Sequence, residues 1–210
     1  MYINPITSIT NYLQNSQFET WGPLNGSGAT FSTASQSYLS VGSSTAFNFS
    51  DSTFTIETRI NRATASTARI GIYTQGTDTA NQIFFGILND ALVFSCVTAG
   101  TTIAYHSTAS LSWNTGEWYD VAMVRNGSAL LILNRGQNLG VSATTSLGAA
   151  ALPSLTSTVY IGAWAGSANG LAGSMDEYRV STSARYSAGY NVTTSNFSSD
   201  SSTSLLLHLD

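Results

Sequence analysis

The carboxylates near the end of the chain are the first residues to consider for chemistry. Asp176 and Glu177 are neighbours within Gly173–Val180, while Asp200 and Asp210 stand apart from other acidic residues. Glycoside hydrolysis needs two carboxylates facing each other, about 5–5.5 Å apart for retention and further apart for inversion. Adjacent residues of a strand point to opposite faces, so Asp176 and Glu177 are not expected to act as such a pair.

The two histidines do not supply a catalytic arrangement either. His106 and His208 each lack a nearby nucleophile motif, and His208 lies among leucines, which favours a structural role. The glycines at Gly26–Gly28 lack the strand and helix that a phosphate-binding loop requires. The sequence therefore predicts a protein that is not an enzyme.

Calcium binding is a second chemistry that isolated acids could support. Calcium takes six to eight oxygen ligands, from carboxylates, amides and backbone carbonyls. Asp176, Asp200 and Asp210 are the candidate residues, and Asp176 with Asp210 forms the predicted metal site, with calcium as the expected ion. The alternative for Asp176 is that it braces the turn between loop and strand.

Sugar recognition is the third chemistry, because tryptophan rings stack on the apolar faces of pyranoses beside polar side chains. Trp164 lies among small residues in the loop Gly162–Gly173, where it has little to pack on, and Asn169 lies in the same loop. Trp113 and Asn114 form a second candidate pair before Gly116. Sites of this kind are concave, with a few convergent polar groups. The alternative for Trp164 is a ring folded back over the sandwich edge or buried in a subunit contact.

Period-two alternation dominates the elements that must position these residues. Residues 54–60 place Phe54, Ile56 and Ile60 on one face, and Thr55, Glu57 and Arg59 on the other. Asn89-Asp90 and Asn126-Gly127 are hairpin turn signals between apolar runs. Helix is limited to a turn or two, with 147–152 and 183–186 as candidates. Many short strands joined by such turns predict an all-β, antiparallel two-sheet β-sandwich, a jelly roll.

The composition of the chain excludes several classes of partner. The 210 residues carry a net charge of −4, with seven arginines and no lysine, so the clustered positive charge that nucleic acids require is absent. No apolar run approaches the ~20 residues of a membrane span, and the start at Met1 lacks a signal-peptide pattern. A single cysteine, Cys96, excludes an internal disulfide. We expect no membrane insertion and synthesis in a host cytoplasm.

Four segments in sequence order resemble one family. They are Phe54-Thr55-Ile56-Glu57, the run from Trp118 to Arg125, the run from Gly173 to Val180 followed by Ala184-Arg185-Tyr186, and Leu205–Asp210. Together they resemble the concanavalin A-like, laminin-G-like jelly-roll domains, of the type found in phage virion proteins. The resemblance covers residues 29–210, implies that residues 29–41 are the opening strand, and implies that Trp118 is a core residue. Residues 1–28 fall outside it and are predicted to be an N-terminal arm or linker.

The resemblance implies a non-catalytic virion surface protein of a bacteriophage, acting as a capsid decoration, fibre or receptor-contact module. Its expected partners are cell-surface glycans, copies of itself in a homo-oligomer, and other virion structural proteins bound through residues 1–28. The alternative is an extracellular bacterial adhesin or carbohydrate-binding module.

Overall fold

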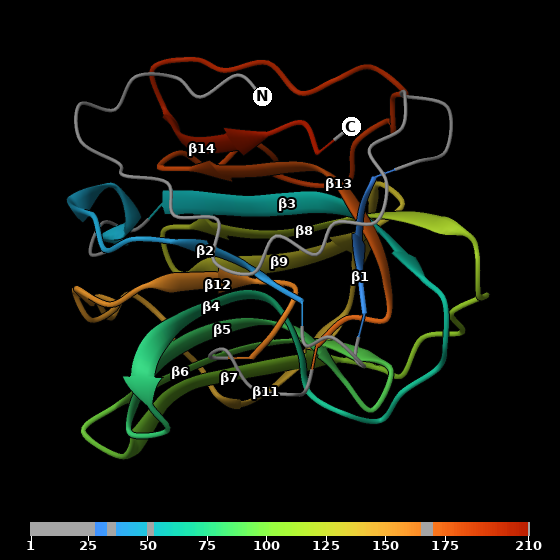
Figure 1. Cartoon of the computed structure of the whole chain (residues 1–210). Coiled ribbons are helices and arrows are strands. Elements are labelled where there is room, and N and C mark those ends of the chain that lie inside the picture. The colour runs from blue at the N-terminus through green and yellow to red at the C-terminus, as the bar shows by residue number, and fades with distance from the viewer. Residues whose placement is uncertain (1–27, 33–36, 50–52, 165–169, 210) are drawn as a thin grey trace.

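The computed structural model describes residues 28–32, 37–49, 53–164 and 170–209. The described residues form two antiparallel sheets packed face to face (Figure 1). This confirms the predicted two-sheet sandwich. Residues 1–27 lie outside the described part, so the predicted N-terminal arm remains a prediction.

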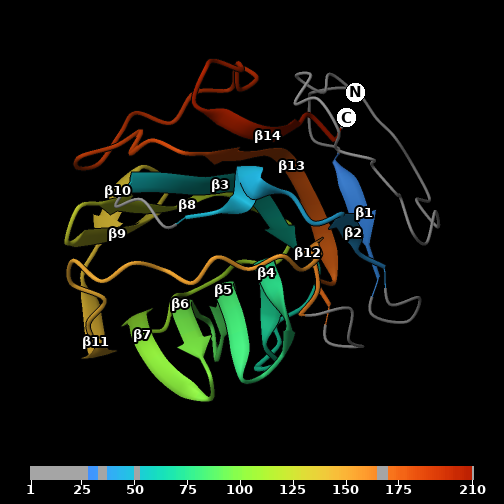
Figure 2. The same ribbon diagram turned by 90° about the vertical axis from the view of Figure 1, so that its left-hand side faces the viewer.

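Each sheet has seven strands, and neighbours in space are often distant in sequence. Sheet A contains, in spatial order, β1 (Ala29–Phe31), β13 (Gly173–Ser181), β3 (Thr53–Arg62), β8 (Trp118–Asn126), β9 (Ala129–Asn134) and β10 (Gln137–Leu139), with β14 (Thr203–Leu207) also beside β13. Sheet B contains β11 (Val141–Thr145), β7 (Thr101–Thr108), β6 (Ala91–Thr98), β5 (Asn81–Leu88), β4 (Ile70–Asp78), β12 (Val159–Ile161) and β2 (Leu39–Val41). In Figure 2, sheet A forms the upper layer and β4–β7 the lower one.

The core lies between the two layers and is built by the predicted alternation. Phe54, Ile56 and Ile60 of β3 are fully buried in it, as the sequence predicts. From sheet B, Phe85 and Phe94 face them from paired positions of β5 and β6. Burial of such side chains contributes about 1.5–3 kcal/mol each, so this layer supplies most of the driving force for folding.

Two predicted hairpins are present. Asn89 and Asp90 both have positive φ, 50° and 62°, in a two-residue turn between β5 and β6. The turn between β8 and β9 consists of Gly127 and Ser128, one residue later than the dipeptide signal, with Gly127 at φ 64°. Tight turns of this kind require the left-handed conformation, which explains the residue types.

Three local expectations are wrong. Residues 29–41 form two strands in different sheets, β1 and β2, rather than one opening strand. The short helix among the described residues is a 3-10 turn at Thr45–Phe47, while 147–152 and 183–186 are not helical. Trp118 is half-buried and lies outside the core, because the alternation of β8 turns Tyr119 inward and Trp118 outward.

The outer face of sheet A is covered by the connection between β13 and β14, residues 182–202, which we call the strap. Its aromatic residues Tyr186 and Tyr190 pack with Ala184 on a small apolar cluster made by Ala122, Val124 and Leu133. The strap also contacts the β9–β10 turn, where the Tyr190 N–H donates to the Gly136 carbonyl at 2.8 Å. A side chain at position 136 would clash with the Tyr190 carbonyl, so glycine is required there.

The polar face of β3 holds the strap in place. Thr55 donates to the Ser183 carbonyl, and Arg59 donates to the carbonyls of Thr193 and Ser195. Between them lies the fully buried carboxylate of Glu57, which accepts from Arg179 Nε at 2.8 Å and from the Tyr186 hydroxyl at 2.7 Å. Of the residues predicted to face away from the core, Thr55 and Glu57 are thus themselves buried, and Arg59 is half-buried.

Within the described residues, no helix has the length and hydropathy needed to cross a membrane.

Replacing Glu57 with glutamine tests how much this buried pair stabilises the fold. The change leaves Arg179 buried without its counter-charge, so we expect the free energy of unfolding to fall by about 3–5 kcal/mol. Urea denaturation measures the loss. Glu117→Gln is the matched control, since Glu117 pairs with Arg135 at the exposed surface and its loss should leave the midpoint unchanged. A Glu57→Gln midpoint equal to that of the parent protein would contradict the assignment.

Candidate functional site

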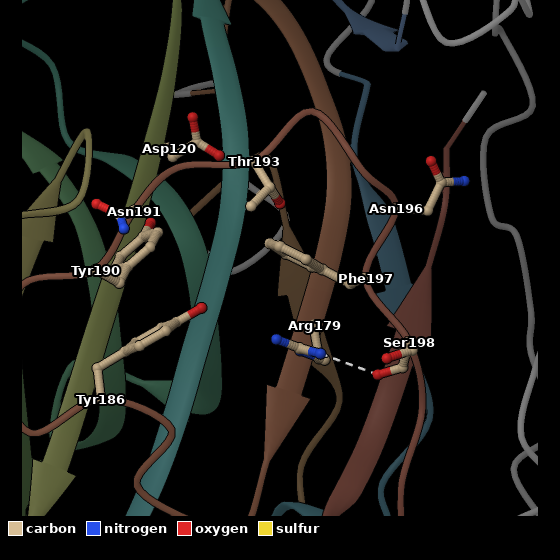
Figure 3. Close-up of a pocket in the computed structure, with 9 residues that line it drawn as sticks. All are labelled: Asp120, Arg179, Tyr186, Tyr190, Asn191, Thr193, Asn196, Phe197 and Ser198. Carbon is tan, nitrogen blue, oxygen red and sulfur yellow. Dashed lines mark hydrogen bonds between the residues drawn. The ribbon is translucent and has the colours of Figure 1, made fainter.

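A pocket of about 250 Å³ lies between the strap and the outer face of sheet A. Figure 3 shows the strap crossing over β3, with Tyr186 and Tyr190 on one side of the pocket and Phe197 on the other. A second hollow of about 270 Å³ shares Tyr190 and Asn191 with it. The two hollows therefore adjoin at Tyr190 and Asn191, and the second extends to the β9–β10 turn.

The floor of the pocket is charged but internally compensated. Asp120 of β8 accepts from Arg59 Nε at 3.1 Å, and Arg179 of β13 pairs with Glu57 and donates to the Ser198 carbonyl at 2.9 Å (Figure 3). Burial raises the pKa of Asp120 above its ordinary value, against the opposing effect of Arg59. The floor is thus a set of fixed hydrogen-bonding groups with little net charge.

Aromatic rings form the walls. Tyr186 and Tyr190 stack with their ring centroids 4.2 Å apart and their planes 14° from parallel. Opposite them, the Phe197 ring lies 4.4 Å from the guanidinium carbon of Arg179. Burial raises the pKa of both tyrosines above its ordinary value.

The rim carries small neutral polar side chains. Asn191, Thr193 and Asn196 are exposed strap residues that line the opening. Amide and hydroxyl groups beside aromatic rings are the combination that binds sugar hydroxyls and pyranose faces. Asp120 is the one carboxylate among the described lining residues, so a pair of carboxylates for hydrolysis is not present in this lining.

The structure places Trp164 on the opposite side of the molecule, over the outer face of sheet B. There it packs on Phe84, Ala91 and Val93, and its indole N–H donates to Gln82 Oε1 at 3.1 Å. The expectation that this ring has little to pack on is therefore wrong, because the outer face of sheet B carries its own apolar cluster. The ring remains partly exposed. Asn169 lies outside the described residues.

Trp113 and Asn114 lie neither in the strap pocket nor beside Trp164. Trp113 packs on the edge of the core against Tyr119, with ring centroids 4.8 Å apart, and donates to the Asp90 carbonyl at 2.8 Å. The Asn114 backbone N–H donates to the Tyr119 hydroxyl, and the residue is exposed. The indoles of Trp113 and Trp164 are thus anchored near opposite ends of β5, and the two predicted pairs do not form one site.

The predicted calcium ligands are not brought together. Asp176 is buried and accepts the Glu177 N–H at 2.8 Å, while Asp210 lies outside the described residues. Asp200 binds Arg185 through both carboxylate oxygens, which lowers its pKa to about 2. The described residues contain no cluster of three or more acidic, histidine or cysteine side chains arranged for a metal.

Strand alternation fails at Asp176 and Glu177, contrary to the sequence argument. A bulge interrupts β13, and Glu177 has φ 50°. Register sets Asp176 opposite Arg59, and the buried Glu177 carboxylate accepts from the Phe197 N–H of the strap and lies 2.7 Å from His208 Nδ1. Glu177 thus helps to hold the strap and also binds His208, while Asp176 accepts from the backbone of Glu177.

The pocket residues are those that sequence reasoning missed. Their segment reads as a polar, threonine- and serine-rich connection, whose position on sheet A depends on contacts more than 100 residues away. One signal was available: Tyr186, Tyr190 and Phe197 recur in a segment in which most other residues are small and polar.

A family model described as the concanavalin A-like lectin/glucanases superfamily matches residues 32–188. A search of the curated proteins gave no match.

Solved structures share the fold at low identity. A candidate carbohydrate-binding protein from Bacteroides ovatus is 21% identical with a TM-score of 0.56, over 82% of this chain and 49% of that one. The enzymatically active domain of tailspike protein 2 from bacteriophage CBA120 is 12% identical with a TM-score of 0.62, over 97% and 32%. Domain 4 of the arabinanase AbnA from Geobacillus stearothermophilus, in complex with arabinotriose, is 11% identical with a TM-score of 0.55, over 89% and 78%. This chain therefore spans about half of the first and a third of the second.

Replacing Arg59 with methionine tests whether this residue closes the pocket. The change removes two hydrogen bonds from a charged group to strap carbonyls, each worth about 1.5–3 kcal/mol. We expect amide hydrogen exchange in residues 190–198 to accelerate at least about tenfold, while the core strands stay protected. The control is Arg69→Met, which changes an arginine that lies over Phe84 on the other sheet, sheet B. Unchanged exchange in the strap, or equal acceleration throughout the protein, would contradict the assignment.

Proposed function

This chain belongs to the concanavalin A-like lectin/glucanases superfamily, and we propose that it is a non-catalytic module that binds neutral glycans in the strap pocket. The observation that carries the proposal is the lining of that pocket. Stacked tyrosines, a phenylalanine and three exposed amide or hydroxyl side chains line a space open to solvent.

The size of the pocket fits a single sugar unit. Its volume of about 250 Å³ lies just below the ~300–1,000 Å³ of sites for drug-sized ligands. The adjoining hollow at Gly136 and Gln137 offers a place for a neighbouring unit. Each neutral hydrogen bond contributes about 0.5–1.5 kcal/mol, so a single module binds weakly. Many copies on one particle would raise the effective affinity by avidity.

The contacts of the carboxylates beneath the pocket favour binding of a glycan over its hydrolysis. Asp120 and Glu57 are each held by an arginine, and Glu57 also accepts from Tyr186. A general acid needs a proton to deliver toward the substrate, and a nucleophile needs a free lone pair directed at it. Glu57 instead holds the wall residue Tyr186, and Asp120 holds Arg59, which binds the strap.

We place the protein on a bacteriophage particle, as a decoration, fibre or receptor-contact module, attached through residues 1–28 and present as a homo-oligomer. The fold likeness to a phage tailspike supports this setting. The second candidate is a bacterial adhesin or carbohydrate-binding module, which the likeness to the Bacteroides ovatus protein supports. Mass spectrometry of purified virions distinguishes them, because the chain would be present in particles only in the first case.

Replacing Asn191 and Asn196 with alanine tests the pocket. Multivalent protein on a glycan array identifies a neutral oligosaccharide ligand, whose affinity is then measured by calorimetry. Loss of one hydrogen bond at each position should weaken binding about tenfold or more for the double variant. Both side chains are exposed, so stability should not change.

Two controls accompany this test. Asn138→Ala removes an exposed amide from β10 outside the pocket and should leave affinity unchanged. Asn114→Ala tests the alternative site beside Trp113. If Asn114→Ala weakens binding and the double variant does not, the ligand binds beside Trp113 and Asn114, and the pocket assignment is wrong.

A further inference from the structure

The arginines of this chain are almost all neutralised by a carboxylate. Five of the seven form ion pairs within the described residues: Arg59 with Asp120, Arg62 with Asp90, Arg135 with Glu117, Arg179 with Glu57, and Arg185 with Asp200. In a protein with a net charge of −4, an arginine without an acidic partner therefore stands out.

Arg125 is one of the two exceptions, and it has a structural role. It is fully buried and donates to the backbone carbonyls of Gly127, Gly148 and Ala150, which fixes the loop that follows β11. A ligand cannot reach it.

Arg69 is the other exception, and it lies at the surface. It precedes β4 and extends over the outer face of sheet B, with its guanidinium carbon 4.0 Å from the Phe84 ring centroid and 4.9 Å from that of Trp164. Its Nη2 donates to Ser95 Oγ at 3.0 Å, and its Nε is buried without a partner. In the described part of the chain, no carboxylate lies within ion-pair distance of it.

The side chains around Arg69 form a defined surface. Phe84, Ser95 and Tyr105 lie in one row across β5, β6 and β7, because they are paired in register. Gln82, with the Trp164 indole bound to it, adjoins this row. We call these six residues the Arg69 patch: Arg69, Gln82, Phe84, Ser95, Tyr105 and Trp164.

Stacking fixes the guanidinium before any ligand arrives. A planar guanidinium on aromatic rings can still offer an edge to a carboxylate, and for Arg69 that edge is Nη1 and Nη2, since Nε is buried. Because the group is already ordered, a ligand loses less entropy on binding than it would with a freely rotating arginine. Desolvation lowers the pKa of Arg69 below its ordinary value, so an incoming anion would relieve an unfavourable charge burial.

We propose that the Arg69 patch binds a carboxylate-bearing saccharide, such as a uronic acid unit. Arg69 binds the carboxylate, the exposed part of Trp164 contacts the sugar ring, and the Tyr105 hydroxyl supplies a further polar contact. Neither Arg69 nor Tyr105 was indicated by the sequence. The site lies on the sheet opposite the strap pocket, so it is a second site that does not depend on the proposed neutral-glycan function.

The test compares acidic oligosaccharides with their uncharged counterparts. The probes are trigalacturonate and sialyllactose, each beside its methyl ester, titrated at low salt while tryptophan fluorescence is recorded. We expect at least one acid to bind, and its ester to bind at least about tenfold more weakly, because a hydrogen-bonded ion pair is lost.

Variants then locate the site. Arg69→Gln should weaken binding of that acid at least about tenfold, and Arg69→Lys should weaken it by less, since it keeps the charge but loses the planar fork. Arg135→Gln, which removes an exposed arginine on sheet A, should leave it unchanged. Melting temperatures of the variants separate lost binding from lost fold.

The outcomes are decisive either way. Equal binding of acid and ester, unchanged binding by a folded Arg69→Gln protein, or no binding of either acid would overturn the proposal. The Asn191→Ala, Asn196→Ala double variant should bind the acid normally. Loss of acid binding in that variant with retention in Arg69→Gln would instead assign the acid to the strap pocket.

Discussion

The buried ion pair between Glu57 and Arg179 is the interaction on which the pocket depends. Glu57 lies in the middle of the polar face of β3, and its two oxygens bind a sheet residue and the strap residue Tyr186. A carboxylate with no exposed surface requires such partners, since an isolated buried charge would be strongly unfavourable. Satisfying Glu57 therefore positions the strap, and the strap supplies the walls and rim of the pocket. Stability and candidate function share one set of contacts.

The layered fold could be predicted because its signals are local. Alternation in β3 separates Phe54 and Ile56 from Glu57, and Asn89-Asp90 permits the turn that joins β5 to β6. The prediction of side-chain direction was wrong where a contact between distant segments interrupts the alternation of a strand. The bulge in β13 sets Glu177 at positive φ, because its carboxylate is held by His208 and by the strap. Periodicity contains no information about such contacts.

The candidate sites were harder to predict for the same reason. The sequence identified Trp164 as unusual, but its surroundings depend on Phe84 and Arg69, which reach it only when β4 and β5 form the outer face of sheet B. Arg69 is distinguished by lacking a carboxylate partner while being partly exposed, and both are properties of the folded chain. The strap pocket likewise requires a polar connection to fold back over the sheet that it leaves.

Two different surfaces lie on opposite faces of one sandwich, a neutral pocket under the strap and a cationic patch on sheet B. We propose that the strap pocket binds sugar. Amide chemical-shift mapping by NMR, with the neutral oligosaccharide selected from an array, tests this claim most directly. If the pocket binds the sugar, the largest chemical-shift changes should fall in residues 186–198 and at Asp120 and Arg179, and sheet B should be unaffected. Chemical-shift changes confined to sheet B, or to the residues around Trp113, would contradict this proposal.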